Sequence, residues 1–188
     1  MVLLPIPEPA TRTAALRSGQ VDWIEAPSPD AIPSLEKAGF KLISNAYPHN
    51  WTWHLSFADN SPWKDVRVRK ALYQAIDIQT INRVTMRGLS QPTGTLIAPQ
   101  VNGWTRKADS RWPYDVEASK KLLAEAGYPQ GFEVDFACPN NRYINDEEIC
   151  QSVTAMWAKV GVKAKLRTQP LTTYFPMIQR YEASIYML

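Results

Sequence analysis

The first part of the chain alternates short apolar runs with helical stretches. Residues 2–6 form an apolar run, residues 10–18 have the spacing of a helix that stops before Gly19, and residues 21–26 are apolar again. A short apolar run bounded by turn residues is typical of a buried strand. The pattern therefore predicts a strand–helix–strand start, followed by a second short helix over residues 29–38.

The middle of the chain contains two aromatic and β-branched runs and the strongest helical pattern. Residues 41–47 and 51–57 have the composition of strands. Residues 65–87 carry apolar side chains on one helical face and charges elsewhere, which predicts an amphipathic helix packed on a core. Residues 88–113 hold three prolines and three glycines without a clear period, so we expect an irregular segment ordered by packing or by function.

The last part again alternates helices and strands. Asp115 is the expected N-cap of a helix that Gly127 ends. A further helix is predicted to start at Asn145, with three acids in its first turn, as the helix dipole favours. The other predicted elements are strands at 132–138, 162–168 and 183–188 and a helix at 171–182. This alternation along the whole chain predicts an α/β fold.

Both ends of the chain are apolar, which is unusual for a natural domain. A predicted strand begins at Val2, and another still runs at Leu188. The sequence after Met1 has neither a basic segment nor a small-residue cleavage site, so no secretory signal is visible. We therefore expect an excised internal piece of a longer protein, truncated at both ends.

Composition excludes two broad classes of function. The 188 residues include 21 Lys and Arg against 18 Asp and Glu, and no basic block of the kind that nucleic-acid binding needs is present, so no nucleic-acid partner is expected. Mean hydropathy is −0.32, and no apolar run approaches the roughly 18 residues of a membrane-spanning helix.

The sequence offers little organised catalytic chemistry. It lacks the nucleophile-elbow, P-loop and dinucleotide-binding patterns. His49 and His54 are the only histidines and fall on opposite faces of a predicted strand end, so a metal site is not expected. The alternative interpretation is a small α/β hydrolase-like enzyme that uses Cys138 beside His54, or the acids at 146–148. A helix cap and the helix dipole explain those acids more simply.

Aromatic residues concentrate near the polar loops of the middle of the chain. Large rings with one polar handle pack cores, and they also line pockets for amphiphilic ligands. For most of these tryptophans the core is the expected place: Trp51, Trp53, Trp63, Trp104 and Trp112.

Four phrases, in this order, resemble the extracellular solute-binding proteins of peptide-type ABC importers, the dipeptide- and oligopeptide-binding family 5. They are PxxATRTAALRSGQVDWI, PWKDVRVRKALYQAIDIQTI, YDVEASKKLLAEAGYPQGFEVDF and AMWAKVGVKAKL. The phrase DVRVRxALxxAID at residues 65–77 is the most specific. Ile78 departs from the family, which often has Arg or Lys there.

The resemblance implies a lobe of a two-lobed fold of the periplasmic-binding-protein type (type II, class C), with a mixed sheet and flanking helices. Residues 1–48 would belong to the first, larger lobe, and residues 49–188 to most of the second ligand-gripping lobe, called domain III. Family members are not enzymes. They bind peptides or related solutes without a cofactor, in the periplasm or lipid-anchored outside the cytoplasmic membrane, and deliver them to ABC permease subunits.

The resemblance also implies which parts of a binding site this chain holds. Residues 183–188 match the strand before the family's GWxxD stretch, whose Asp holds the ligand's amino group and is absent here, so a complete site is not expected. Arg142 and Tyr143 correspond to two residues of dipeptide-binding relatives that touch the ligand. A guanidinium on a loop can hold a carboxylate through two hydrogen bonds. The solute itself stays open between a dipeptide, an oligopeptide, glutathione, an opine and a sugar derivative.

Two further expectations concern the two cysteines and the truncated end of the chain. Cys138 ends a predicted strand and Cys150 lies on the second turn of the next helix. An exported protein meets oxidising conditions, so we predict a Cys138–Cys150 disulfide. Residues 183–188 would leave an uncovered strand edge, through which the piece is expected to self-associate.

Overall fold

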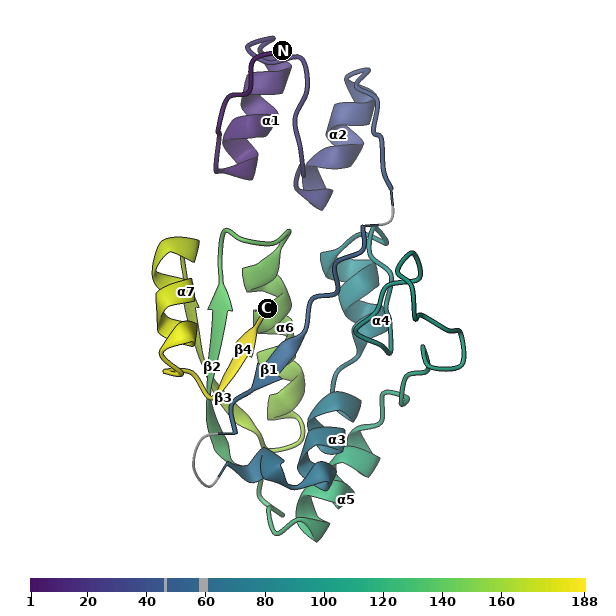
Figure 1. Cartoon of the computed structure of the whole chain (residues 1–188), viewed down its shortest axis with the longest axis vertical. Coiled ribbons are helices and arrows are strands. Elements are labelled where there is room, and N and C mark those ends of the chain that lie inside the picture. The colour runs from purple at the N-terminus through teal and green to yellow at the C-terminus, as the bar shows by residue number, and fades with distance from the viewer. Residues whose placement is uncertain (46, 58–60) are drawn as a thin grey trace.

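The computed structural model describes residues 1–45, 47–57 and 61–188 (Figure 1). A four-stranded sheet forms its centre in the order β1-β4-β2-β3. The strands are β1 (Trp53–Leu55), β2 (Glu133–Pro139), β3 (Lys163–Gln169) and β4 (Ile185–Met187). β2 pairs in parallel with both β3 and β4, while β1 pairs antiparallel with β4. The predicted α/β class with a mixed sheet is confirmed.

Helices surround this sheet and also form a separate group at one end. The helical elements are α1 (Pro9–Arg17), η1 (Pro29–Ala31), α2 (Ile32–Lys37), η2 (Pro62–Lys64), α3 (Val66–Gln74), α4 (Ile78–Thr80), the π-helix η3 (Ile81–Thr85), α5 (Val116–Glu125), α6 (Asp146–Ala158) and α7 (Leu171–Gln179). Figure 1 shows α1 and α2 beyond the end of the sheet toward which β2 runs. Among the described helices, none has the combined length and apolar character that crossing a membrane requires.

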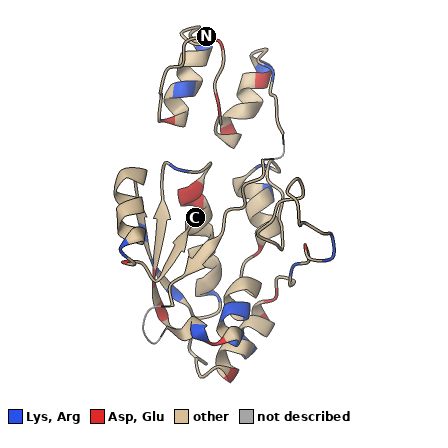
Figure 2. Cartoon of the chain, viewed as in Figure 1, with Lys and Arg blue, Asp and Glu red and all other residues tan. Residues whose placement is uncertain are grey.

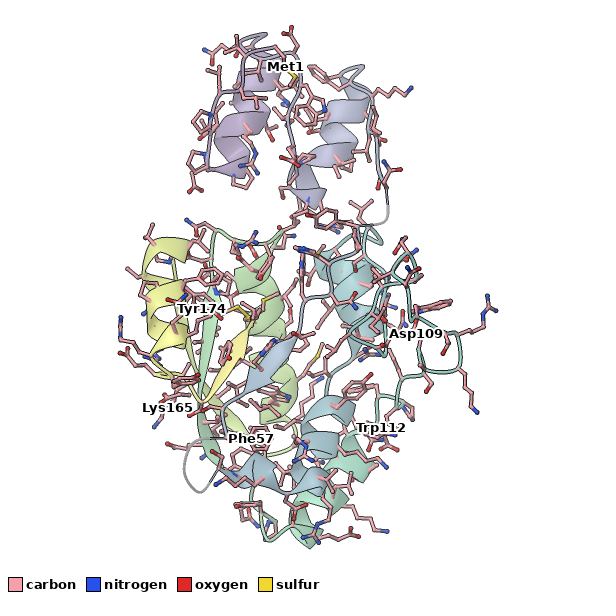
Figure 3. All side chains as sticks on the ribbon, in the orientation of Figure 1. Met1, Phe57, Asp109, Trp112, Lys165 and Tyr174 are labelled. Atoms are coloured by element: carbon pink, nitrogen blue, oxygen red, sulfur yellow. A yellow bond between two sulfur atoms is a disulfide. The ribbon has the colours of Figure 1, made fainter. Side chains whose placement is uncertain are left out.

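The two faces of the sheet pack against different helices. Alternate residues of β2 point to opposite faces, so Phe136 joins the larger core with α3, α5 and α6, while Ala137 packs under α7. Trp157 lies in the larger core, where its ring packs at a tilt against Phe136 with 5.1 Å between the ring centres. On the other face, the buried Tyr174 hydroxyl donates to the Met187 carbonyl at 2.6 Å, and Figure 3 shows Tyr174 between α7 and the sheet.

Three strands predicted before residue 50 are wrong. Residues 2–6, 21–26 and the described part of 41–47 have no regular structure, and residue 46 lies outside the described residues. A strand needs a neighbour that pairs with its backbone, and the sheet of this chain contains only segments from residue 53 onward. Large apolar side chains such as Leu3 and Trp23 are exposed here as a result.

The predicted helix over 65–87 is also shorter than expected. α3 ends at Gln74, and the carboxylate of Asp77 caps a new helical turn by accepting the Thr80 N–H at 3.0 Å. The backbone then passes through the π-helix η3 and reaches a positive φ at Arg87. Apolar spacing continues through these breaks, which is why periodicity alone did not reveal them.

The expectation of an uncovered strand at residues 183–188 is wrong. β4 lies inside the sheet, between β1 and β2. Its neighbours flank it on both sides, with Trp53 opposite Met187 and Phe136 opposite Ile185. The edges of the sheet are β1 and β3 instead.

Candidate functional site

The carboxyl ends of the parallel strands β2, β3 and β4 meet at one edge of the sheet. Because β1 runs the opposite way, its beginning lies at this edge too. Ligands of open α/β sheets commonly bind outside the carboxyl ends of strands. The segment that follows β2 here, residues 140–145, is called the β2–α6 loop below.

The side chains of Arg142 and Tyr143 extend from the β2–α6 loop, and the Tyr143 ring lies next to Trp51, which precedes β1. The Tyr143 ring lies 5.2 Å from the Trp51 ring, and the Arg142 guanidinium lies 4.9 Å from the centre of the Tyr143 ring. Trp51 and Tyr143 are half-buried against the larger core, whereas Arg142 is exposed. Burial raises the pKa of the Tyr143 hydroxyl, so this group stays a neutral hydrogen-bond donor near neutral pH.

The Arg142 guanidinium carries donors that the chain itself leaves unused. Over residues 1–45, 47–57 and 61–188, this side chain makes no hydrogen bond or ion pair, and its guanidinium lies over the Tyr143 ring. Other arginines of the chain are engaged: Arg12, for example, donates to the carbonyls of Ile6, Pro7 and Ala26. A planar cation held by an aromatic ring and open to solvent is suited to bind a carboxylate.

Asp146 holds the backbone of the β2–α6 loop. Its side chain is only 2% exposed, and its carboxylate accepts the N–H groups of Arg142 and Tyr143, each at 2.9 Å, and that of Glu147 at 3.0 Å. Burial raises the pKa of this carboxyl above its ordinary value, and the N–H donors offset only part of that shift.

Asparagines fix the two ends of the same loop. Asn145 has a φ of 54°, and its side-chain amide donates to the Thr85 carbonyl at 2.8 Å. At the other end, the side-chain oxygen of Asn141 accepts the Leu171 N–H at 2.8 Å, which ties the loop to the start of α7. The loop is therefore anchored to η3, α6 and α7.

The predicted disulfide is present and spans the β2–α6 loop. Cys138 and Cys150 are bonded, with their Cα atoms 6.5 Å apart. The Met187 sulfur lies 3.7 Å from each cysteine sulfur, and both cysteines are fully buried. The bond joins the end of β2 to α6, so it closes a ring that contains the whole loop.

The hydrolase interpretation finds no support in the structure. The sulfur of Cys138 is bonded to Cys150 and is not a free thiol. Two of the three acids at 146–148 have different partners: Asp146 accepts from the backbone of the loop, while Glu147 accepts from Gln151 at 3.3 Å. His54 stacks on Tyr186 at 5.2 Å.

The other predicted candidates lie apart from this edge or in the core. Within the described ranges, no group of three or more His, Cys, Asp and Glu is placed to hold a metal ion. Trp63 is buried, and its indole donates to the Ser56 carbonyl. Trp104 and Trp112 lie in the irregular segment, where Trp104 donates to Asp109 and Trp112 packs on Tyr73.

Sequence reasoning missed the role of Asp146 in the loop. Its position in a first helical turn is fully explained by the helix dipole, and nothing in the spacing indicates that its carboxylate bonds to residues before the helix. The one available signal was its distance of four residues from Arg142 across a short loop, because Asp side chains often bond to nearby backbone N–H groups.

Comparison with known proteins places the whole chain in one group. The family model described as "Bacterial extracellular solute-binding proteins, family 5 Middle" matches residues 1–188. The chain is 30% identical to Heme-binding protein A of Haemophilus influenzae over 175 residues, which is 92% of this chain and 31% of that protein. It is 31% identical to the Dipeptide-binding protein of Escherichia coli over 166 residues, 86% of this chain and 31% of that protein.

A solved structure shares the fold over nearly the full chain. The periplasmic binding protein DppA of Helicobacter pylori, in complex with the peptide STSA, superposes with a TM-score of 0.87 at 23% identity, covering 97% of this chain and 35% of that one. This chain thus spans about a third of the length of the relatives that it matches. The match over all 188 residues shows that the chain belongs to the bacterial extracellular solute-binding proteins of family 5.

Proposed function

We propose that this chain is part of the substrate-binding component of an ABC importer. That component captures peptides or peptide-like solutes outside the cytoplasmic membrane and delivers them to permease subunits. Family membership over the whole chain supports this role, as does the dipeptide that names one relative. The protein acts in the periplasm or anchored by lipid to the outer face of the membrane, and it binds its solute without converting it.

Residues 1–48 belong to the first lobe of this protein and residues 49–188 to most of the second. Two features support the division. Among the described residues, the strands of the sheet begin at residue 53 and its large core at Trp51, whereas residues 1–45 form a small helical group whose apolar side chains are largely exposed. The ion pair between Asp30 and Arg87, at 2.7 Å, links the two parts.

Arg142 and Tyr143 contact the bound solute in this proposal. The observation that carries it is the exposed Arg142 guanidinium, which lies at the carboxyl edge of the sheet without a hydrogen-bond partner in the described chain. The loop beneath it is closed by a disulfide and anchored at both ends. A rigid loop of this kind binds a carboxylate without losing further conformational freedom.

Calorimetry with a panel of solutes tests the function. The panel contains Ala-Ala, Ala-Ala-Ala-Ala, glutathione, deoxycholate and heme, because relatives are named for dipeptide, glutathione, deoxycholate and heme binding. We expect the full-length protein that contains this chain to bind at least one peptide-like member with micromolar or tighter affinity. The isolated 188-residue chain should bind it far more weakly, because clamp proteins bury most of a ligand between two lobes.

Two results would contradict the proposal. Binding of heme or deoxycholate with no peptide-like solute bound would exclude peptides as the solute class. Full affinity in the isolated chain would show that the second lobe alone forms the site.

A further inference from the structure

The buried carboxylate of Asp146 accepts most of its hydrogen bonds from residues that precede its helix, which is unusual at a helix start. It is the first residue of α6. A carboxylate at a helix start normally accepts N–H groups of the helix itself. Here two of its three donors, the N–H groups of Arg142 and Tyr143, precede the helix. The side chain therefore connects α6 to the loop more than it caps α6.

The two loop donors share one oxygen atom, Oδ2, at equal distances of 2.9 Å. Two successive N–H groups that point at one atom fix the orientation of both peptide planes. The direction in which each side chain leaves the backbone is then fixed as well. The two side chains are those of Arg142 and Tyr143, the exposed cation and the ring beside it.

The ionised form suits this position better than a neutral amide would. The carboxylate offers two acceptor oxygens, and Oδ1 takes the third donor, Glu147 N–H, at 3.0 Å. An asparagine would keep one acceptor and turn an NH₂ group toward backbone N–H donors. No Lys or Arg forms an ion pair with Asp146 in the part of the chain that the structure describes. Its burial therefore costs free energy that only hydrogen bonds offset.

We propose that Asp146 is a positioning residue for solute binding: its carboxylate holds the backbone of Arg142 and Tyr143 so that the guanidinium and the ring are presented together to the solute. This inference rests on the proposed function of that pair. Whether Asp146 holds the loop can be measured without any solute. This half of the proposal can therefore be rejected independently of the proposed function.

Amide hydrogen exchange of the ligand-free 188-residue chain tests the first half. In Asp146→Ala, which removes both acceptor oxygens, we expect the Arg142 and Tyr143 amides to exchange about tenfold faster or more, while the amide of Val153 in α6 is unchanged. The control is Glu148→Gln, an exposed acid in the same helical turn, which should leave all three amides as they are. Asp146→Ser serves if Asp146→Ala fails to fold, and the same acceleration is expected because the serine hydroxyl is one bond shorter than the carboxylate that reaches the loop.

Unchanged exchange at Arg142 and Tyr143 would overturn the proposal. So would faster exchange spread evenly through α6 and the sheet, because that result indicates a general structural role.

A double-mutant cycle in the full-length protein tests the second half, with the tightest-binding solute of the panel as the probe. Asp146→Ala should weaken binding about tenfold in the wild type, and by less than about twofold when Arg142 and Tyr143 are both alanine. An equal loss in both backgrounds would show that Asp146 does not act through this pair. Failure of the wild type to bind any probe would instead reject the proposed function, while the exchange result stands.

Discussion

Single polar side chains complete the backbone hydrogen bonding where regular structure ends. The last carbonyls of an α-helix have no partner within the helix. At the end of α3, the Trp157 indole donates to the Leu72 carbonyl at 3.0 Å. The buried Ser119 hydroxyl adds a second donor, at 2.8 Å, to the Ala71 carbonyl, which also accepts the Ala75 N–H at 3.0 Å. Both donors come from other helices, so they also lock α5 and α6 to α3.

Asp109 has a similar role in the irregular segment, where Figure 3 shows it away from the sheet. Its carboxylate accepts the Gly94 N–H at 2.6 Å, the Thr93 hydroxyl at 2.7 Å and the Trp104 indole N–H at 3.2 Å. These bonds lower the pKa of the Asp109 carboxyl, the Gly94 N–H first among them. The Asp109 side chain thus connects distant parts of a segment in which no helix or strand forms.

We predict that Asp109→Asn destabilises the chain at neutral pH and that the loss shrinks on acidification. The pKa of Asp109 is lower in the folded state, so its contribution is present above the ordinary carboxyl pKa and is lost as pH falls through the folded pKa. Urea unfolding at pH 7 and near pH 3 measures the difference in the free energy of unfolding. An equal difference at both pH values would show that the ionised carboxylate is not what matters.

At the scale of elements, a close backbone contact joins the turns before β2 and β3. Gly131 and Gly161 both have positive φ, at 73° and 84°. A Cβ on Gly131 would lie 2.0 Å from the Gly161 carbonyl oxygen, which real atoms do not allow. The two backbones touch where the parallel pairing begins, at Glu133 opposite Lys163.

We predict that Gly131→Ala destabilises the chain by clearly more than the about 1–3 kcal/mol that a positive φ alone costs. The control is Gly127→Ala, because Gly127 also has a positive φ, 93°, but a Cβ there meets nothing within 4 Å. Equal losses in the free energy of unfolding for the two variants would show that the turns can separate without cost.

The sequence correctly predicted helices and strands whose pairing and packing partners also lie within this chain. α5 begins after Asp115, whose carboxylate accepts the Ala118 N–H as expected of an N-cap, and β2 and β3 fall within two residues of their predicted ranges. The strands predicted before residue 50 failed, because period and composition report a tendency to be buried and cannot supply the neighbouring strand. The conformation of the β2–α6 loop depends on Asn145 at positive φ, which no spacing reveals.

At the scale of the whole molecule, the described residues form a sheet body and a smaller helical group near the carboxyl ends of its parallel strands (Figure 1). Figure 2 shows both signs of charge interspersed over the ribbon, with acidic residues at the start of α6. Electrostatic attraction of a highly charged partner is therefore not the main feature of this surface. The exposed apolar side chains of the helical group agree with the proposal that this chain is part of a two-lobed clamp.

The most direct test of this account is the affinity of the full-length protein for its tightest peptide-like solute with and without Arg142. We predict that Arg142→Ala weakens binding about 10- to 150-fold, the loss expected for one charge-assisted hydrogen-bonded contact of about 1.5–3 kcal/mol. Arg106→Ala, which removes an exposed arginine of the irregular segment, should change affinity by less than about twofold. The ligand-free melting temperature should be the same for both variants and the wild type. Unchanged affinity in Arg142→Ala, or weaker binding accompanied by a large fall in melting temperature, would contradict the assignment of this edge as the solute site.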